Sequence, residues 1–313
     1  MNSSFILIFV CLIVGALLKR TGRFPASSGQ AFNSFVIWVS LPAVVLTQVP
    51  VLLEKAELDA SLLIPISMPW IQFFLSFILF YYLAKKFRWS PAETGALILT
   101  AGLGNTSFVG FPILESFYGK EGLSVGILVD QPGSFFVVST IGLVTATLFS
   151  SAAGTKLQVS TLVKKIISFP PFIALILGIL RFMTGTYGPS AVQTVLDRLA
   201  ITLVPLALIA VGFQLNVSAP VLRRQWRPLL SGLAFKLFVS PAVFFFFYIF
   251  LLGEKGLMVR ATVIEAAMAP MITAAVIAED FKLNSEIANL MVGVGIPLSL
   301  ATVYLWHFFL SLV

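Results

Sequence analysis

Charged side chains are scarce in this sequence. Asp, Glu, Lys and Arg make up 11% of the 313 residues, whereas they make up about a quarter of a typical soluble domain. So few charges cannot cover the surface of a water-soluble globule of this length, and 58% of the residues are hydrophobic. We therefore expect lipid to be the solvent for much of the surface, and residues 1–313 to form a single membrane domain.

Cysteine and histidine are almost absent. Cys11 is the single cysteine and His307 is the single histidine. One thiol excludes an intrachain disulfide and a cysteine-rich metal site, and one imidazole excludes an HExxH motif. The same scarcity leaves little material for the nucleophile–base pair of an intramembrane enzyme. We therefore expect neither an enzyme nor a resident cofactor.

Apolar runs fill the sequence between the few charges. A bilayer core needs about 20 apolar residues per helix, and ten windows of the sequence qualify. They cover about 4–19, 30–50, 61–84, 92–117, 122–149, 166–183, 195–216, 228–252, 258–279 and 286–311. We predict an all-α membrane protein with ten transmembrane helices in the lipid bilayer.

Basic residues give the chain a net charge of +7, and they lie in short loops between the apolar windows. The loops after odd-numbered windows hold thirteen Lys and Arg residues, including Lys156, Lys164 and Lys165, while the other loops hold six. The positive-inside rule places the richer side in the cytoplasm. We therefore expect a multi-pass protein of the cell membrane with both termini outside and no nucleic-acid partner.

An internal repeat relates the two halves of the chain. Adding 163 to a residue number aligns Gly, Thr, Ser, Gln and Pro residues of the first half with identical residues of the second, although chance agreement between apolar segments is an alternative. The aligned pairs are Gly15 with Gly178, Thr21 with Thr184, Gly22 with Gly185, Ser27 with Ser190, Gln30 with Gln193 and Pro42 with Pro205. Five spans per half make the two copies inverted in the membrane, which is typical of secondary transporters.

The fourth and ninth windows contain residues that interrupt a helix. Gly costs about 1 kcal/mol and Pro about 3 kcal/mol in a helix interior, and such paired interruptions indicate a transport site, although two ordinary proline kinks are an alternative. The free N–H groups of a half-helix favour an anion. The candidate substrate-binding residues are Asn105, Thr106, Ser107, Pro112, Lys236, Pro270 and Met271.

Three ionisable residues fall inside predicted spans, namely Asp130, Lys236 and Glu265. A charge at membrane depth is costly unless it is paired or wetted, so each is a candidate functional group. Asp130 and Lys236 could instead extend to the membrane surface. Glu265 could instead form a structural pair with Lys236.

Four strings resemble the auxin efflux carrier family, and the match covers nearly the whole chain. They are GNTSFVGFPILESFYG, KLFVSPAVFFF, GLMVRATVIEAAMAPMITAAVIAEDF and SEIANLMVGVGIPLSLATVYLWHFF. The resemblance, to a bacterial member, implies the fold of bile-acid/sodium symporters, with two inverted five-helix repeats and broken, crossing helices at spans four and nine. It also implies a scaffold over about 1–50 and 166–217, a moving core over about 61–150 and 228–311, and a possible homodimer through the scaffold helices.

The same resemblance implies a secondary transporter of a small organic anion. Bacterial members of the family are linked to malonate and malate, and plant members export indole-3-acetic acid, so a mono- or dicarboxylate carried by alternating access of the elevator type is the first expectation. An uncoupled anion uniporter or channel-like carrier, or a sodium-coupled bile-acid-type symporter, is the alternative. This sequence departs from many relatives at Ala269 and Glu265 in span nine, which affects the expected substrate and coupling ion more than the fold.

Glu265 is the candidate for ion coupling. It falls where the related bile-acid symporters carry a sodium-liganding glutamate, and oxygen ligands suit a hard cation. We expect a Na⁺ site of Glu265, Asp130, Gln131, Asn105 and Thr106, with a proton on the same carboxylate as the alternative.

Overall fold

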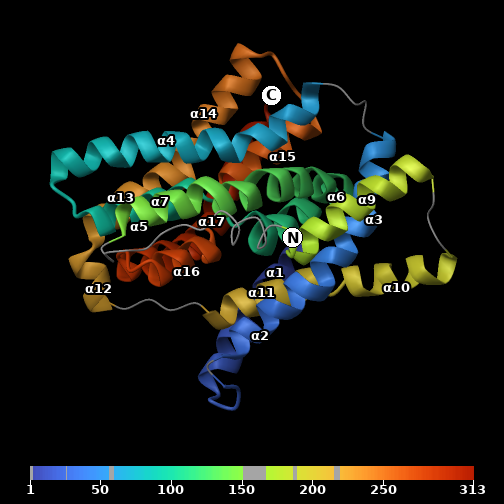
Figure 1. The fold of residues 1–313 in the computed structure, drawn as a ribbon, viewed down its shortest axis with the longest axis horizontal. Coiled ribbons are helices and arrows are strands. Elements are labelled where there is room, and N and C mark those ends of the chain that lie inside the picture. The colour runs from blue at the N-terminus through green and yellow to red at the C-terminus, as the bar shows by residue number, and fades with distance from the viewer. Residues whose placement is uncertain (1–2, 26, 56–59, 151–166, 186–188, 215–218) are drawn as a thin grey trace. The chain divides into compact units, whose positions relative to one another are not determined.

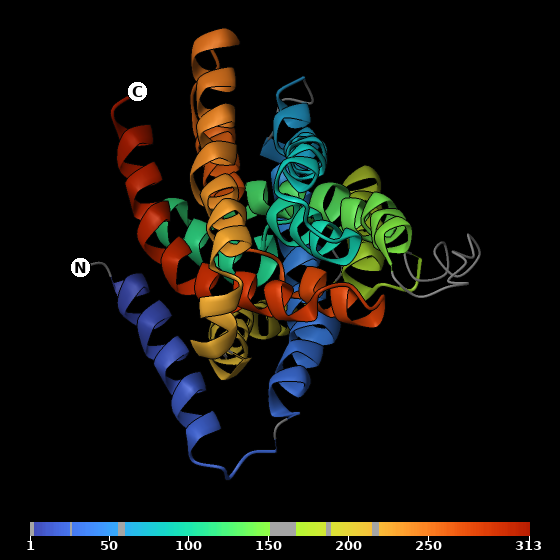
Figure 2. The ribbon, with the colours of Figure 1, turned by 90° about the vertical axis from the view of Figure 1, so that its left-hand side faces the viewer.

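A computed structural model describes residues 3–25, 27–55, 60–150, 167–185, 189–214 and 219–313, and these residues form α- and π-helices and no β-strand (Figures 1 and 2). Six of the helices are long and apolar enough to cross a membrane. They are Ser28–Val51, Leu63–Phe87, Thr106–Phe149, Ser190–Gln214, Trp226–Leu251 and Ser285–Ser311. The protein is therefore an all-α membrane protein, as predicted, while the count of ten spans and their inversion stay predictions. The loop residues Lys156, Lys164 and Lys165 lie outside the described residues.

The chain divides into two compact units. The first comprises residues 1–61, 107–127 and 164–215. Its helices are α1 (Ser3–Arg20), α2 (Ser28–Phe35), α3 (Leu41–Lys55), α6 (Phe111–Val129, which runs two residues beyond the unit), α9 (Pro170–Thr184), α10 (Ser190–Ala200) and α11 (Leu203–Gln214). The backbone of α6 leaves helical geometry at Gly119 (φ 65°, ψ −157°), which separates the two windows predicted around it.

Close contact between α1 and α11 depends on two glycines. A Cβ on Gly15 would lie 2.2 Å from the carbonyl oxygen of Ile209, and a Cβ on Gly212 would lie 2.2 Å from that of Leu12. Any larger residue would therefore push the two backbones apart. Small residues at helix contacts are the usual way to pack helices in lipid, where no hydrophobic force draws them together.

The second unit comprises residues 62–106, 128–163 and 216–313. Its α-helices are α4 (Leu63–Phe87), α5 (Pro91–Gly102), α7 (Leu143–Phe149), α12 (Ala219–Arg224), α13 (Trp226–Ala234), α14 (Ser240–Phe246), α15 (Leu257–Ala266), α16 (Ile272–Asp280) and α17 (Ser285–Ser311). Four π-turns lie between them, at Asp130–Phe135, Val138–Gly142, Phe235–Val239 and Phe247–Leu251. The predicted scaffold and moving core are defined by how they move relative to each other, so the division of the chain into these two parts stays a prediction.

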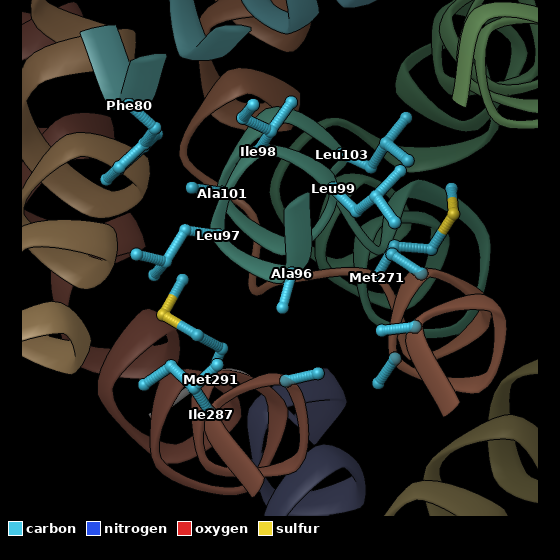
Figure 3. Packing of buried hydrophobic residues seen from close by; sticks show 14 of the residues in the cluster. Phe80, Ala96, Leu97, Ile98, Leu99, Ala101, Leu103, Met271, Ile287 and Met291 are labelled. Atoms are coloured by element: carbon cyan, nitrogen blue, oxygen red, sulfur yellow. The ribbon is translucent and has the colours of Figure 1, made fainter. Parts of the chain in front are cut away.

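Helix α5 is the centre of the second unit. All residues from Thr94 to Gly102 are buried, and Leu97, Ile98 and Leu99 point to different sides among side chains of neighbouring helices (Figure 3). The helix begins where the Ser90 side chain accepts the N–H of Glu93 at 3.2 Å, with proline at the first helical position. A helix that is apolar on every side is a buried helix. Its C-terminal end is thereby held inside the unit.

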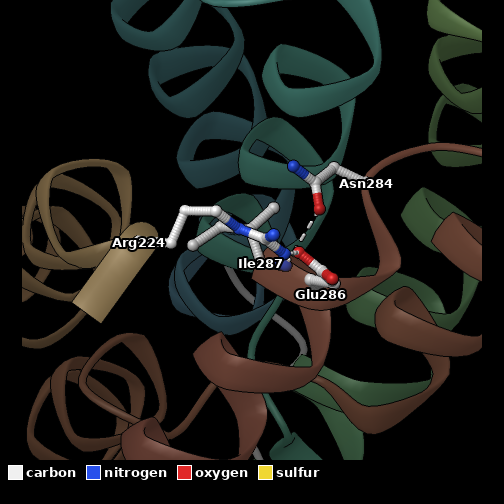
Figure 4. Close-up of polar contacts among 4 residues, drawn as sticks. All are labelled: Arg224, Asn284, Glu286 and Ile287. Carbon is white, nitrogen blue, oxygen red and sulfur yellow. Dashed lines mark hydrogen bonds and ion pairs between the residues drawn. The ribbon is translucent and has the colours of Figure 1, made fainter. Parts of the chain in front are cut away.

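Helix α17 begins with a side-chain cap. The Asn284 Oδ1 atom accepts the N–H of Ile287 at 3.2 Å (Figure 4). The Asn284 backbone N–H donates to the carbonyl of Ala92 at 3.1 Å. Arg224 and Glu286 form an ion pair beside this cap. Because both of these side chains are exposed, the pair contributes little stability. The cap and its backbone bond therefore fix the start of α17 against α5.

Candidate transport site

The fourth and ninth predicted spans are each interrupted by a short non-helical segment. After α5, Leu103 is extended (φ −114°, ψ 127°), and helix resumes only at Thr106. After α15, the chain is irregular until Met271, which is also extended (φ −68°, ψ 129°), and α16 begins at Ile272. The interruptions predicted near Asn105 and Pro270 are therefore present.

The two breaks are joined by their backbones. Asn105 donates its N–H to the carbonyl of Ala269 at 2.7 Å, and Met271 donates to the carbonyl of Leu103 at 3.0 Å. Gly104 and Pro270 form an isolated antiparallel bridge between these bonds. In lipid, backbone groups freed from a helix must find partners inside the protein. Each break supplies partners for the other, so the geometry of one depends on the other.

Lys236 is the cation at this junction. Its side chain is fully buried, and its Nζ atom donates to the carbonyl of Ala266 at 3.0 Å. Pro270 lies four residues after Ala266 and has no N–H to offer that carbonyl, so the ammonium takes the place of the missing helical donor. A Cβ on Gly104 would lie 3.0 Å from Nζ, which is a tight contact. The alternative in which Lys236 extends to the membrane surface is wrong.

Glu265 lies next to the residue that Lys236 contacts and is also fully buried. Neither of its carboxylate oxygens accepts a hydrogen bond from any described residue. Asp130 and Lys236 are near enough to interact with its charge. No hydrogen bond from Lys236 to Glu265 is found among the described residues, so both carboxylate oxygens are available to a proton or a cation. The alternative of a structural pair of the two charges stays open.

Asp130 is held by two side chains. Thr106 donates its hydroxyl to Oδ1 at 2.5 Å, and Gln131 donates its amide to Oδ2 at 2.7 Å. All three residues are buried, which excludes the alternative of Asp130 at the surface. The π-turn at Asp130–Phe135 carries both Asp130 and Gln131, and such turns are frequent at functional sites. The structure thus joins Thr106, beside the first break, to the fifth predicted span.

Gln72 is not among the site residues predicted from the sequence, and the structure places it at the first break. Its Nε2 atom donates to the carbonyl of Gly102 at 3.3 Å, at the last residue of α5 before the break. Ser76, one turn later on α4, donates to the carbonyl of Ile98 at 3.1 Å. A buried Gln in an otherwise apolar helix was the available indication, because such a group must bond to something.

Ser107 and Pro112 are placed differently from the other predicted substrate-binding residues. Ser107 lies in the π-turn Thr106–Gly110, and Pro112 is the second residue of α6. Both belong to the first compact unit, whereas Asn105, Thr106, Lys236, Pro270 and Met271 belong to the second. A role for Ser107 and Pro112 in binding stays a prediction.

Buried oxygen atoms remain available at the predicted cation site. No group of three or more His, Cys, Asp or Glu side chains that could hold a metal ion is found within the described residues. The oxygens of Glu265 and the Oε1 atom of Gln131 are buried and accept no hydrogen bond from described residues. Carboxylate and amide oxygens are ligands that hard cations accept. The site for Na⁺, or for a proton, at Glu265 stays a prediction.

Paired helix breaks in an apolar, all-α protein are typical of one class of protein, the multi-pass membrane transporters. Comparison with known proteins agrees, because residues 2–307 match the family described as membrane transport protein, and the chain belongs to that family. It is a transporter and not an enzyme.

Three relatives extend this result. The chain is 26% identical over 309 residues to an uncharacterized transporter of Methanocaldococcus jannaschii, covering 97% of each chain. It is 28% identical over 303 residues to an uncharacterized transporter of Methanothermobacter thermautotrophicus, covering 96% of this chain and 95% of that protein. A probable auxin efflux carrier component 9 of Oryza sativa subsp. japonica is 27% identical over 161 residues, or 48% of this chain and 36% of that protein. The resemblance to the auxin efflux carrier family is confirmed.

Proposed function

We propose that this transporter carries a small organic anion, a mono- or dicarboxylate, by alternating access, and that the paired breaks bind the carboxylate. The observation that carries the proposal is the pair of helix breaks whose backbones bond to each other. Helix α16 begins immediately after the break with no side-chain cap on its first N–H groups. Free N–H groups and the positive end of a helix favour an anion. The ammonium of Lys236 at Ala266 adds a positive charge to the same break.

The buried charges support coupling to a cation. Asp130 and Glu265 are two acids, and Lys236 is one base, so the three sum to one negative charge when all are ionised. Charges interact strongly at low dielectric, and an incoming carboxylate would be repelled by this excess. A Na⁺ ion or a proton at Glu265 would remove it. Binding of the cation and binding of the anion would then favour each other, which is how a symporter couples its two substrates.

An uncoupled anion uniporter is the second candidate. Lys236 favours it, because its ammonium already supplies a fixed positive charge at the break, donating to Ala266 at 3.0 Å. A resident cation of this kind reduces the need for a bound one. The two candidates differ in one measurable respect, which is whether transport depends on the sodium or proton gradient.

Contacts within the first unit support two equivalent halves. Gly15 on α1 packs against α11. Its predicted equivalent, Gly178 on α9, packs against α3, where a Cβ on Gly178 would lie 3.2 Å from the Cβ of Val49. If α9 repeats α1 and α11 repeats α3, these are the same contact formed twice. The hydroxyls of Ser40 and Thr202, which lie 162 residues apart, meet at 2.7 Å. The repeat equivalent of Ser40 is Leu203, the residue next to Thr202. A symmetry axis between the halves would bring such nearly equivalent positions together, so we propose two inverted five-span repeats.

Uptake into proteoliposomes tests the function. Purified protein would be assayed with labelled malonate, malate and indole-3-acetate, in sodium, potassium and choline buffers at several pH values. For a sodium symporter, uptake requires sodium in the wild type, and Glu265→Gln removes that requirement or the activity. For a proton symporter, uptake follows the pH gradient and is indifferent to sodium.

Two controls sharpen this assay. Glu279→Gln changes an exposed acid at the end of α16 and should behave as wild type. Uptake by the wild type that depends on neither gradient, and is retained in Glu265→Gln, would favour the uniporter. Failure of every carboxylate to bind or cross would refute the organic-anion proposal.

A further inference from the structure

The helix that carries Lys236 is not regular. Between α13 and α14 lies the π-turn Phe235–Val239, in which the N–H of Ser240 donates to the carbonyl of Phe235, five residues earlier. Such a turn inserts one extra residue into the helix and is costly unless something supports it. Pro241 follows directly, and it has no N–H to offer the carbonyl of Leu237, four residues before it. The carbonyl next to Lys236 therefore lacks its helical donor.

Trp306 supplies that donor from another helix. Its indole Nε1 atom donates to the carbonyl of Leu237 at 2.9 Å, and its side chain is 7% exposed. The ring also lies 6.0 Å from that of Phe245, so it is fixed by packing as well as by the bond. A backbone carbonyl inside a membrane protein must have a partner. The indole meets this need one residue away from Lys236.

The two carbonyls that lack a helical donor because of Pro241 and Pro270 are therefore connected through Lys236 and its neighbour Leu237. Pro241 leaves the carbonyl of Leu237 to Trp306, and Pro270 leaves the carbonyl of Ala266 to Lys236. Because Lys236 and Leu237 are adjacent, the bond from the indole fixes the backbone from which the lysine side chain extends. A fully buried lysine reaching a single carbonyl has little tolerance for movement of that backbone.

We propose that Trp306 is a positioning residue of the transport site. Its N–H holds the π-turn so that Lys236 reaches the break at Ala266, and its loss would move the ammonium without removing it. The inference rests on the proposed function only in treating this break as the place where the anion binds. A purely structural role for the aromatic ring predicts something different, because phenylalanine would then replace it adequately.

Hydrogen–deuterium exchange and ligand binding test the proposal on purified full-length protein in nanodiscs. The variants are Trp306→Phe, Trp306→Phe with Pro241→Ala, and the matched control Trp226→Phe, which changes a tryptophan 52% exposed. Trp306→Phe should increase exchange at residues 235–242 and also at 262–275, the opposite break. Affinity for the carboxylate that the wild type binds should fall by about two- to tenfold, the range of one lost hydrogen bond.

The substitution Pro241→Ala in the double variant is the decisive test of the positioning role. Alanine at position 241 restores an N–H four residues after Leu237, so the double variant should return exchange at 262–275 and the affinity toward wild type. If Trp306→Phe does not fold, the double variant should recover folded protein. Unchanged exchange at 262–275 in Trp306→Phe, or a double variant no better than the single one, would overturn the proposal. If the wild type binds no carboxylate while the exchange pattern appears as expected, the positioning role stands and the anion proposal fails.

Discussion

At three of the places where a proline in the described residues leaves a helix carbonyl without its usual donor, a side chain from another helix donates to that carbonyl instead. The three donor–carbonyl pairs, each with its proline, are Arg181 with Leu46 and Pro50, Trp306 with Leu237 and Pro241, and Lys236 with Ala266 and Pro270. The cost of a proline in lipid is thus met by a specific partner rather than by water. A side chain with this task is constrained in position, which suits Lys236 for the substrate contact that we propose.

Gln72 has a comparable task at the end of α5. We expect Gln72→Met, which keeps the length of the side chain and removes its amide, to lower the free energy of unfolding by about 1–3 kcal/mol, because the buried carbonyl of Gly102 loses its donor. Anion binding should weaken as well, since Gly102 immediately precedes the break. Thermal unfolding in detergent and ligand-induced stabilisation would measure the two effects.

Tyr82→Phe is the matched control for Gln72. Tyr82 lies on the same helix, and its side chain is 65% exposed. Loss of its hydroxyl should change stability little. If Gln72→Met and Tyr82→Phe behave alike, the contact at Gly102 has no special part in holding the break.

At the scale of the helix, two kinds of irregularity meet at the site. Gly and Pro residues predict the breaks after α5 and α15, and both are present. The π-turns that carry Asp130 and Lys236 were not predicted, because no residue type marks a π-turn as proline marks a break. Each turn changes the direction in which the following side chains point. The breaks supply free backbone groups, and the turns direct charged side chains toward them.

Pro270→Ala tests whether the second break must stay open. Removing a proline favours a continuous helix by about 3 kcal/mol, and the new N–H could donate to the carbonyl of Ala266 in competition with Lys236. We expect uptake to be lost while thermal stability in detergent is kept or raised. Pro297→Ala, in the unbroken helix α17, is the control and should retain uptake. Normal uptake by Pro270→Ala would show that the proline is dispensable for transport.

At the scale of the whole molecule, the predicted ten-span topology places successive loops on opposite sides of the membrane. Cys11 is the only cysteine and is buried, so Cys11→Ala gives a background without thiols. In it, Arg88→Cys should react with an impermeant thiol reagent from the cytoplasmic side and Lys255→Cys from the outside, because both positions are exposed. Reaction of both from one side would contradict the span count between them.

Composition determined the solvent of this protein, and with it much of the fold class. Because lipid cannot hydrogen-bond to a backbone, the long apolar runs of this chain predict helices across the bilayer. The Gly and Pro residues in the fourth and ninth windows predict where two of these helices stop. Asn105, Glu265 and Pro270 could be singled out for the same reason, since polar and helix-breaking residues are costly at that depth.

Only the tertiary structure decided what those residues contact. The joining of the two breaks through Asn105 and Ala269, and the bond from Lys236 to Ala266, link positions more than 25 residues apart, and no local pattern specifies such pairs. The hydrogen bonds of Gln72 and Trp306 could not be predicted either. An amide or an indole in an apolar helix indicates that a partner must exist but not which carbonyl it is. A proline reveals which carbonyl has lost its donor, and packing alone chooses the side chain that replaces it.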